Sequence, residues 1–145
     1  DIHVFGEFPE VEELKFPAII VQHTGSGFEE QFMGQKVTLG STSGTGETYG
    51  ASYTIHLICE KETTIQVASG SFSASDAYYK QRRLLNWLML NVANEIMDLN
   101  WSVFDEEDTQ VLERHLNAWQ NIGFIPDLQW YGASADFMIT FTNVR

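Results

Sequence analysis

The sequence has little cysteine and no long apolar run. Cys59 is the one cysteine among 145 residues, so no disulfide can form within the chain. The apolar stretches are short, as at residues 18–21, and none approaches the roughly 20 residues that a membrane-spanning helix requires. No signal peptide is visible, and position 1 is Asp rather than Met, so we expect a trimmed or processed start.

Basic residues are also scarce. Eight Lys and Arg stand against 20 Asp and Glu, which gives a formal net charge of −12. Tight DNA binding requires cations placed on phosphates, so this balance argues against a DNA-binding protein. The basic residues Lys80, Arg82 and Arg83 form a single cluster, interpreted as an exposed helix start. Acidic residues gather at 7–13 and 105–108, which is typical of a solvated surface.

The apolar content is sufficient for a core. Hydrophobic residues make up 43% of the chain and aromatic residues 13%, which argues against disorder. A chain of this length buries roughly 68–70% of its unfolded surface and folds without disulfides or metals. No linker or internal repeat interrupts the sequence. We therefore predict a single domain over residues 1–145.

The first half of the chain predicts strands. Residues 16–21 are apolar and partly β-branched, with Pro17 near the beginning, as in a buried strand that ends at residues 24–27. Residues 31–39 form a second strand candidate. Residues 41–46 are Ser, Thr and Gly, which is typical of a loop tip.

Residues 48–60 alternate clearly between two faces. Tyr49, Tyr53 and Leu57 fall on one face, and Thr54 and His56 fall on the other. We therefore expect a long hairpin over residues 31–60, with the Gly/Ser tip projecting from the domain.

Residues 77–99 predict the one long helix. Apolar side chains recur at helical spacing, as in Leu84, Leu88, Val92 and Ile96. Ser73 or Ser75 is a candidate cap, and Asp76 places a favourable charge at the helix start. The apolar stripe predicts that this helix lies across one face of a sheet containing Ile19, Ile55 and Ile139.

The last part of the chain contains both helix and strand patterns. Residues 111–122 fit either a helix or the outer face of a strand. Residues 124–127 predict a turn, and residues 128–142 alternate as a strand. The fold class is therefore α+β, mainly an antiparallel sheet with a long hairpin and one long helix packed across one face.

Chemical motifs are missing. The glycines at residues 41–46 lack the spacing of a phosphate-binding loop. The acidic run 105–108 lacks the alternating ligands and the central glycine of a calcium loop. Cys59 falls on the apolar face of a strand and is interpreted as a core residue. Trp87 and Trp119 are interpreted as packing residues, because no basic groove accompanies them.

The histidines do not form a recognisable metal motif. They are His3, His23, His56 and His115. No two lie three or four residues apart and no cysteine pair accompanies them, which disfavours a zinc site. His56 is interpreted as a partly buried, hydrogen-bonded strand residue. We predict no catalytic residue, no cofactor and no metal.

Two segments carry a resemblance to a known family. They are Phe-Pro-Ala-Ile-Ile-Val-Gln-His-Thr-Gly at residues 16–25 and Trp-Tyr-Gly-Ala-Ser-Ala-Asp-Phe-Met-Ile-Thr-Phe at residues 130–141. Both resemble phage tail terminator proteins, which share a Phe-Pro-Ala strand ending in Thr-Gly, a long strand, an acid-capped helix and a closing Trp-x-x-Ser-Ala-Asp strand. The equivalents of that last motif are Trp130, Ser134, Ala135 and Asp136, with three residues rather than two between the Trp and the Ser. The resemblance also favours a strand over residues 111–118.

One departure from the family pattern concerns the start of the chain. The family opens with an amphipathic helix before the Phe-Pro-Ala strand, and nothing stands before Asp1 here. Either the given chain lacks that first element, or the protein is a related neck or tail-completion protein.

The resemblance implies a structural role in the virion. Tail terminators form a homohexameric ring at the head-proximal end of the tail tube, stop tube growth and dock on the head connector. DNA passes through the ring without tight binding, and a negative lumen repels its phosphates. The implied partners are the tail tube protein and head-closure proteins, and no membrane is involved.

Two sets of residues are candidates for these roles. Phe28, Phe32 and Met33 place apolar side chains beside a glycine-rich bend, which predicts a subunit interface. Glu29 and Glu30 lie between them and are candidates for lining the DNA channel. The competing hypothesis is a small α+β enzyme or ligand-binding domain whose site is built from scattered residues.

Overall fold

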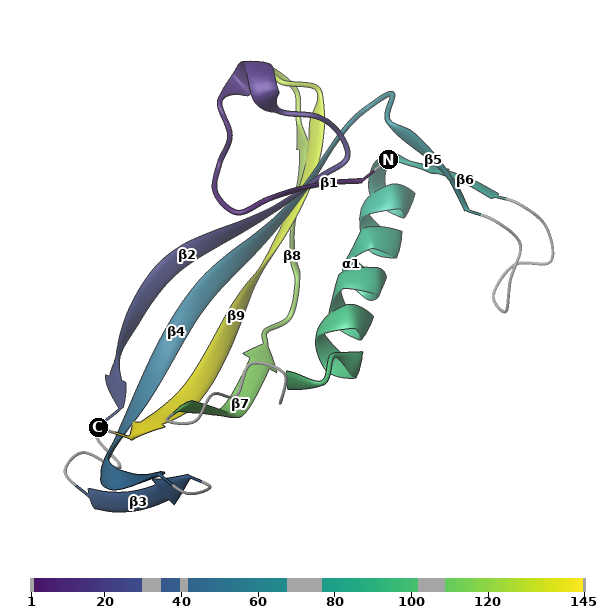
Figure 1. Ribbon diagram of the computed structural model, residues 1–145. Helices are drawn as coiled ribbons and strands as arrows, with labels where there is room; N and C mark the ends of the chain where they lie inside the picture. Colours follow the sequence, from purple (N-terminus) through teal and green to yellow (C-terminus); the bar gives the residue numbers. More distant parts are fainter. Residues whose placement is uncertain (1, 30–34, 40–41, 68–76, 102–108, 145) are drawn as a thin grey trace.

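Eleven elements are found in the computed structural model, which describes residues 2–29, 35–39, 42–67, 77–101 and 109–144. Among these residues there is one α-helix (Figure 1). The elements are β1 (His3–Phe5), η1 (Val11–Glu13), β2 (Ala18–Glu29), β3 (Gln35–Leu39), β4 (Thr42–Glu60), β5 (Thr64–Val67), β6 (Ala77–Lys80), α1 (Gln81–Asp98), β7 (Thr109–Leu116), β8 (Gln120–Ile125) and β9 (Trp130–Val144).

The main sheet is rich in antiparallel pairs. Its strand order is β1-β2-β4-β9-β7, with β3 paired to β4 and β8 paired to β9. The β1–β2 pair is parallel, whereas β2, β4, β9 and β7 alternate in direction. A separate two-stranded sheet joins β5 and β6. The α+β class and the large antiparallel-rich sheet are confirmed.

Strand β4 is the centre of the sheet, as its alternation predicts. It pairs with β9 from Gly46 to Glu60 and with β2 from Thr48 to Ile58. Its apolar positions Ala51, Ile55, Leu57 and Cys59 are buried. The interpretation of Cys59 as a core residue is therefore correct.

The glycine-rich segments are strands rather than loops. Strand β2 does not end at residues 24–27; a bulge between His23 and Gly25 shifts the register, and pairing continues to Glu29. Residues 42–46 belong to β4 and pair with β3, so they are strand rather than loop. Tertiary pairing outweighs the low strand propensity of Gly and Ser here.

The long hairpin over residues 31–60 is not confirmed. Strands β3 and β4 pair only over a short stretch, from Gln35 opposite Gly46 to Leu39 opposite Thr42. The rest of β4 pairs with β2 on one side and with β9 on the other. Figure 1 shows β3 at one extremity of the molecule, beyond the end of α1.

The helix begins four residues later than predicted. Residues 77–80 pair with β5 as strand β6, and the N-cap is Lys80, which makes no side-chain cap bond. The predicted cap, Ser73 or Ser75, is therefore wrong, and Asp76 is not at the helix start. The chain turns from strand to helix at Gln81, which has a φ of 57°. Its carbonyl accepts a bond from Cys59 Sγ at 3.7 Å, and its side chain meets the Tyr131 hydroxyl at 3.4 Å.

The core lies between the first half of α1 and the sheet. Leu84, Leu85 and Leu88 are buried among residues of β4 and β9, which include Ile55, Leu57, Cys59, Ala133 and Phe137. Val92 and Ile96, one and two turns further, are only partly buried beside this cluster, as are Ile19 and Ile139. Packing of α1 across the whole face is therefore not confirmed. Within the described residues no helix is long and apolar enough to cross a membrane.

Residues 109–144 form three strands with short connections. Residues 109–116 form strand β7, so the strand prediction is correct and the helical alternative is wrong. Phe124 and Ile125 belong to β8, and the predicted turn starts only at Pro126. Strand β9 then runs from Trp130 to Val144, with Ala133, Ala135 and Phe137 buried.

Candidate assembly surfaces

The sheet has two faces of different chemistry. Cross-strand partners share a face, so the register assigns the residues of each. The helix-side face carries Tyr53, Ile55, Ala135, Phe137 and Ile139, among others. The outer face carries Ser52, Thr54, His56, Ser134, Asp136, Met138 and Thr140. The first face is apolar and the second is rich in hydroxyl groups.

The helix is too short to cover the apolar face. An 18-residue helix is about 27 Å long at 1.5 Å per residue. The 19 residues of β4 span about 60 Å at 3.2–3.4 Å per residue. In Figure 1 the β3 end of the sheet extends well past the last turn of α1. A large part of the helix-side face therefore has no helix over it in the described chain.

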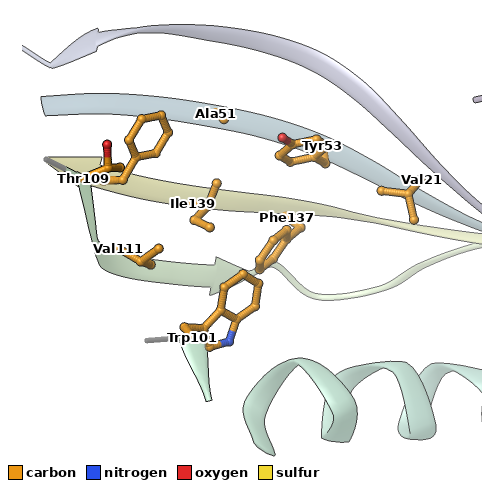
Figure 2. Close-up of a pocket in the computed structure, with 9 residues that line it drawn as sticks. Val21, Ala51, Tyr53, Trp101, Thr109, Val111, Phe137 and Ile139 are labelled. Atoms are coloured by element: carbon orange, nitrogen blue, oxygen red, sulfur yellow. The ribbon is translucent and has the colours of Figure 1, made fainter. Parts of the chain in front are cut away.

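An apolar groove occupies this part of the face. It has a volume of about 390 Å³ and is lined by Val21, Ala51, Tyr53, Trp101, Thr109, Val111, Phe137, Ile139 and Phe141 (Figure 2). Trp101 forms one wall, with its ring centroid 5.6 Å from that of Phe137. Nearly all lining atoms are hydrocarbon. The groove is therefore suited to apolar contact rather than to chemistry on a substrate.

Trp101 is fixed by the end of the helix. Its Nε1 donates to the Ile96 carbonyl at 2.9 Å. The Arg114 guanidinium lies 5.5 Å from the indole centroid and donates through Nη2 to the Met97 carbonyl at 3.3 Å. Strand β7 and the last turn of α1 are thereby tied together. The groove wall is preformed within the subunit.

The predicted interface residues are only partly placed. Phe28 lies in β2 and pairs with Tyr49, whose ring stacks on Phe141 of the groove. By register, Phe28 occupies a position of the helix-side face. Phe32 and Met33 lie outside the described residues. A register position within one subunit does not test a contact between subunits, so the interface assignment stays a prediction for all three residues.

Of the two predicted channel residues, one lies within the described residues and one does not. Glu29 lies in β2 and pairs with Thr48, a position on the outer face, whereas Glu30 lies outside the described residues. The register of β2, β4, β7 and β9 assigns three acidic residues to this face, Glu29, Glu113 and Asp136. It assigns no Lys or Arg of these described strands to it. The outer face is therefore neutral to acidic.

Cys59 and His56 do not form a catalytic pair. Three residues apart on one strand, they lie on opposite faces of the sheet. Cys59 is fully buried, and burial raises the pKa of its thiol to about 11, which keeps it protonated and unreactive. This environment suits a core residue.

His56 has the environment expected of a structural strand residue. Its Nε2 lies 3.3 Å from Gln22 Oε1, and its ring contacts Phe8 at 4.8 Å. Burial lowers the pKa of His56, although the nearby Asp136 carboxylate opposes that shift. Asp136 itself accepts a bond from Thr54 Oγ1 at 3.0 Å. The four histidines sit on β1, β2, β4 and β7, and among the described residues no three His, Cys, Asp or Glu side chains gather as a metal site.

No protein-family model matches this sequence. A search of curated proteins likewise finds no match. The role of the chain is therefore inferred from its own surfaces.

The groove could not be found by sequence reasoning alone. Its lining residues come from β2, β4, β7, β9 and the residue that follows α1, so only tertiary pairing brings them together. The alternation of residues 48–60 and 128–142 did indicate an apolar face. The missing information was the length of that face that the helix leaves open.

Proposed function

We propose that the chain is a structural virion protein, a phage tail terminator. In this proposal it forms a homohexameric ring at the head-proximal end of the tail tube, stops tube growth and joins the tail to the head connector. The protein is made in the host cytoplasm and resides in the neck of the virion. Its partners are the tail tube protein and head-closure proteins, it needs no cofactor, and it performs no catalysis.

The open apolar groove carries this proposal. Exposed apolar area of this kind usually marks an interface, since leaving it in water is unfavourable. Tyr53, Trp101, Val111 and Ile139 line a preformed surface that contains almost no polar atoms. In a ring, the neighbouring subunit covers this surface. Phe28, Phe32 and Met33 are proposed to take part in the contact.

The outer face supports the proposed DNA path. Duplex DNA passing through a ring lies within the Debye length of the wall, about 8 Å at physiological salt. A wall rich in Lys or Arg would bind phosphates by counterion release and slow the passage. The outer face, with Thr54, Asp136 and Thr140, is neutral to acidic. We assign it, with Glu29 and Glu30, to the channel.

The assembled ring completes two features of the fold in this proposal. Residues 31–60 act as a long hairpin that reaches the neighbouring subunit. Helix α1 and the docked neighbour together cover the helix-side face from end to end. In this proposal both features involve the end of the sheet that α1 does not reach (Figure 1).

The test is the size and activity of the purified chain. Six subunits of 16.5 kDa give a ring of about 99 kDa, visible by electron microscopy with a central channel. Added to growing tail tubes of its own phage, the ring should bind one end and stop extension. A small apolar ligand in the groove, with a chain that stays monomeric, would instead favour the ligand-binding alternative.

A further inference from the structure

The described chain carries two oppositely charged segments on different sides of the sheet. Residues 77–83, here called the basic arm, contain Lys80, Arg82 and Arg83 and no acid. Residues 7–13, here called the acidic loop, contain Glu7, Glu10, Glu12 and Glu13 and no base. The two segments have seven residues each, with formal charges of +3 and −4. In a chain with only eight basic residues, three lie in the arm.

The basic arm projects from the helix side of the sheet. It comprises β6 and the first residues of α1, and β6 pairs only with β5 in the described chain. Figure 1 shows the β5–β6 ribbon extending away from the start of α1. Lys80, Arg82 and Arg83 are exposed, and Tyr78 is 65% exposed. The Arg83 guanidinium lies 4.4 Å from the Tyr79 ring centroid, so the arm presents cations and aromatic rings together.

The acidic loop lies on the other side. Phe8 packs on His56 of the outer face, which anchors the loop opposite α1. A 3-10 turn, η1, holds Glu12 and Glu13, with a bond from the Glu13 amide to the Glu10 carbonyl at 2.9 Å. All four glutamates are exposed, and Phe8 is 51% exposed. Figure 1 shows this loop on the side of the sheet away from the β5–β6 ribbon.

We propose that the basic arm of one subunit binds the acidic loop of the next copy of this chain. The charges are complementary, and each segment adds exposed aromatic surface, Tyr78 on the arm and Phe8 on the loop. Within the described residues neither segment has an ion-pair partner of its own. Because the two segments are different and face opposite sides, the contact is heterologous, which is the type that closes into a ring. The inference rests on the proposed ring and adds a second contact between neighbouring subunits, besides the one at the apolar groove.

Opposite charge reversals test the contact. Variant one carries Arg82→Glu and Arg83→Glu, and variant two carries Glu12→Lys and Glu13→Lys. Variant one has an arm of formal charge −1 against a loop of −4, and variant two has an arm of +3 against a loop of 0. Each alone has lost the attraction between arm and loop, so each should assemble at least about tenfold more weakly than the parent at low salt. Mixed in equal amounts, the unchanged loop of variant one (−4) meets the unchanged arm of variant two (+3), and the altered loop of variant two (0) meets the reversed arm of variant one (−1). Every second contact of an alternating ring then has the charge pairing of the parent. The mixture should therefore assemble more strongly than either variant alone, into even-numbered rings in which the two variants alternate, and its mean net charge equals that of the parent.

A matched control separates this contact from net charge. Glu95→Lys with Asp98→Lys changes the charge by the same amount as variant two, at exposed positions near the other end of α1. This control should assemble like the parent. Circular dichroism establishes that every variant is folded, and mass photometry across salt concentrations gives the assembly.

Several outcomes would overturn the proposal. Either single variant assembling as well as the parent would remove the contact, and so would a mixture that stays dissociated. A monomeric parent whose arm binds duplex DNA, with binding lost in variant one, would assign the arm to nucleic acid instead. A ring that depends on the arm but fails to cap tail tubes would support the contact and contradict only the terminator role. Capping that survives in variant one would contradict only the contact.

Discussion

Tyr49 and Phe141 stack face to face on neighbouring strands, with ring centroids 5.4 Å apart and planes inclined by 12°. Tyr49 is the register partner of Phe28, and Phe141 lines the open groove. The pair therefore connects the predicted interface residue to the apolar surface that the structure reveals. Aromatic pairs of this geometry contribute about 0.5–1.5 kcal/mol beyond the area that they bury.

The interface prediction concerns Phe28 and Met33. In the double variant Phe28→Ser, Met33→Ser, mass photometry should show loss of the ring, because two apolar contacts at its edge are replaced by hydroxyl groups. Circular dichroism should show a folded subunit. The control is Met138→Ser, an exposed outer-face residue of β9, which should leave the ring intact. An intact ring in the double variant would place the interface elsewhere.

The core prediction compares two leucines of one helix. Leu88 is 1% exposed and Leu90 is 58% exposed. Leu88→Ala should lower the free energy of unfolding by about 2–5 kcal/mol, because it removes buried methyl groups and leaves a cavity. Leu90→Ala should change it by less than about 0.5 kcal/mol. Urea melts measure both, and equal effects would show that the packed side of α1 is assigned incorrectly.

The cysteine prediction concerns reactivity. Burial raises the pKa of Cys59 to about 11, so at neutral pH the thiol is both protonated and shielded. A thiol-reactive probe should label the native protein only at the rate of unfolding and should label it at once in urea. Cys59→Ala should retain assembly if folded. Rapid labelling of the native protein would contradict the core position of this residue.

The pH prediction concerns His56. Burial lowers its pKa in the folded state below the ordinary 6.5, so below that pH the unfolded chain binds more protons than the folded one. Stability contributed by this site should therefore fall as the pH drops below about 6.5 and level off below the folded-state pKa. Carboxyl groups titrate nearby, so the measurement is the difference between parent and His56→Gln in urea melts. That difference should change with pH in this window, and a constant difference would contradict the shift.

The DNA-path prediction concerns Glu29 and Glu30. Particles carrying Glu29→Lys and Glu30→Lys should assemble, because the Thr48 pairing assigns Glu29 to the outer face rather than to the groove. DNA ejection should slow at low salt and recover at high salt, since new cations in the wall attract phosphates. Unchanged ejection kinetics at low salt would remove these two residues from the channel.

Sequence reasoning succeeded where side-chain pattern and burial agree. The alternation of residues 48–60 predicted the central strand, and the spacing of Leu84, Leu85 and Leu88 predicted the packed side of the helix. It failed where pairing overrides local preference. The Ser/Gly run at residues 42–46 is a strand because β3 and β9 supply hydrogen-bond partners there.

The start of the helix was predicted incorrectly and the groove was not predicted at all, for related reasons. Tyr78 and Tyr79 continue the helical spacing of α1 but pair with β5, a contact that periodicity cannot indicate. The groove depends on Trp101 and β7 meeting β9 across a long gap in sequence. Its extent also depends on the ratio of helix to strand length, which no single segment reveals.

The most direct test of the central claim is the mass of the assembled parent chain. Mass photometry over a range of concentrations should give one closed species near six subunits, about 99 kDa from a 16.5 kDa chain. A closed ring keeps this mass as concentration rises. A chain that remains at the monomer mass throughout, or that grows without limit into open filaments, would contradict the tail-terminator account.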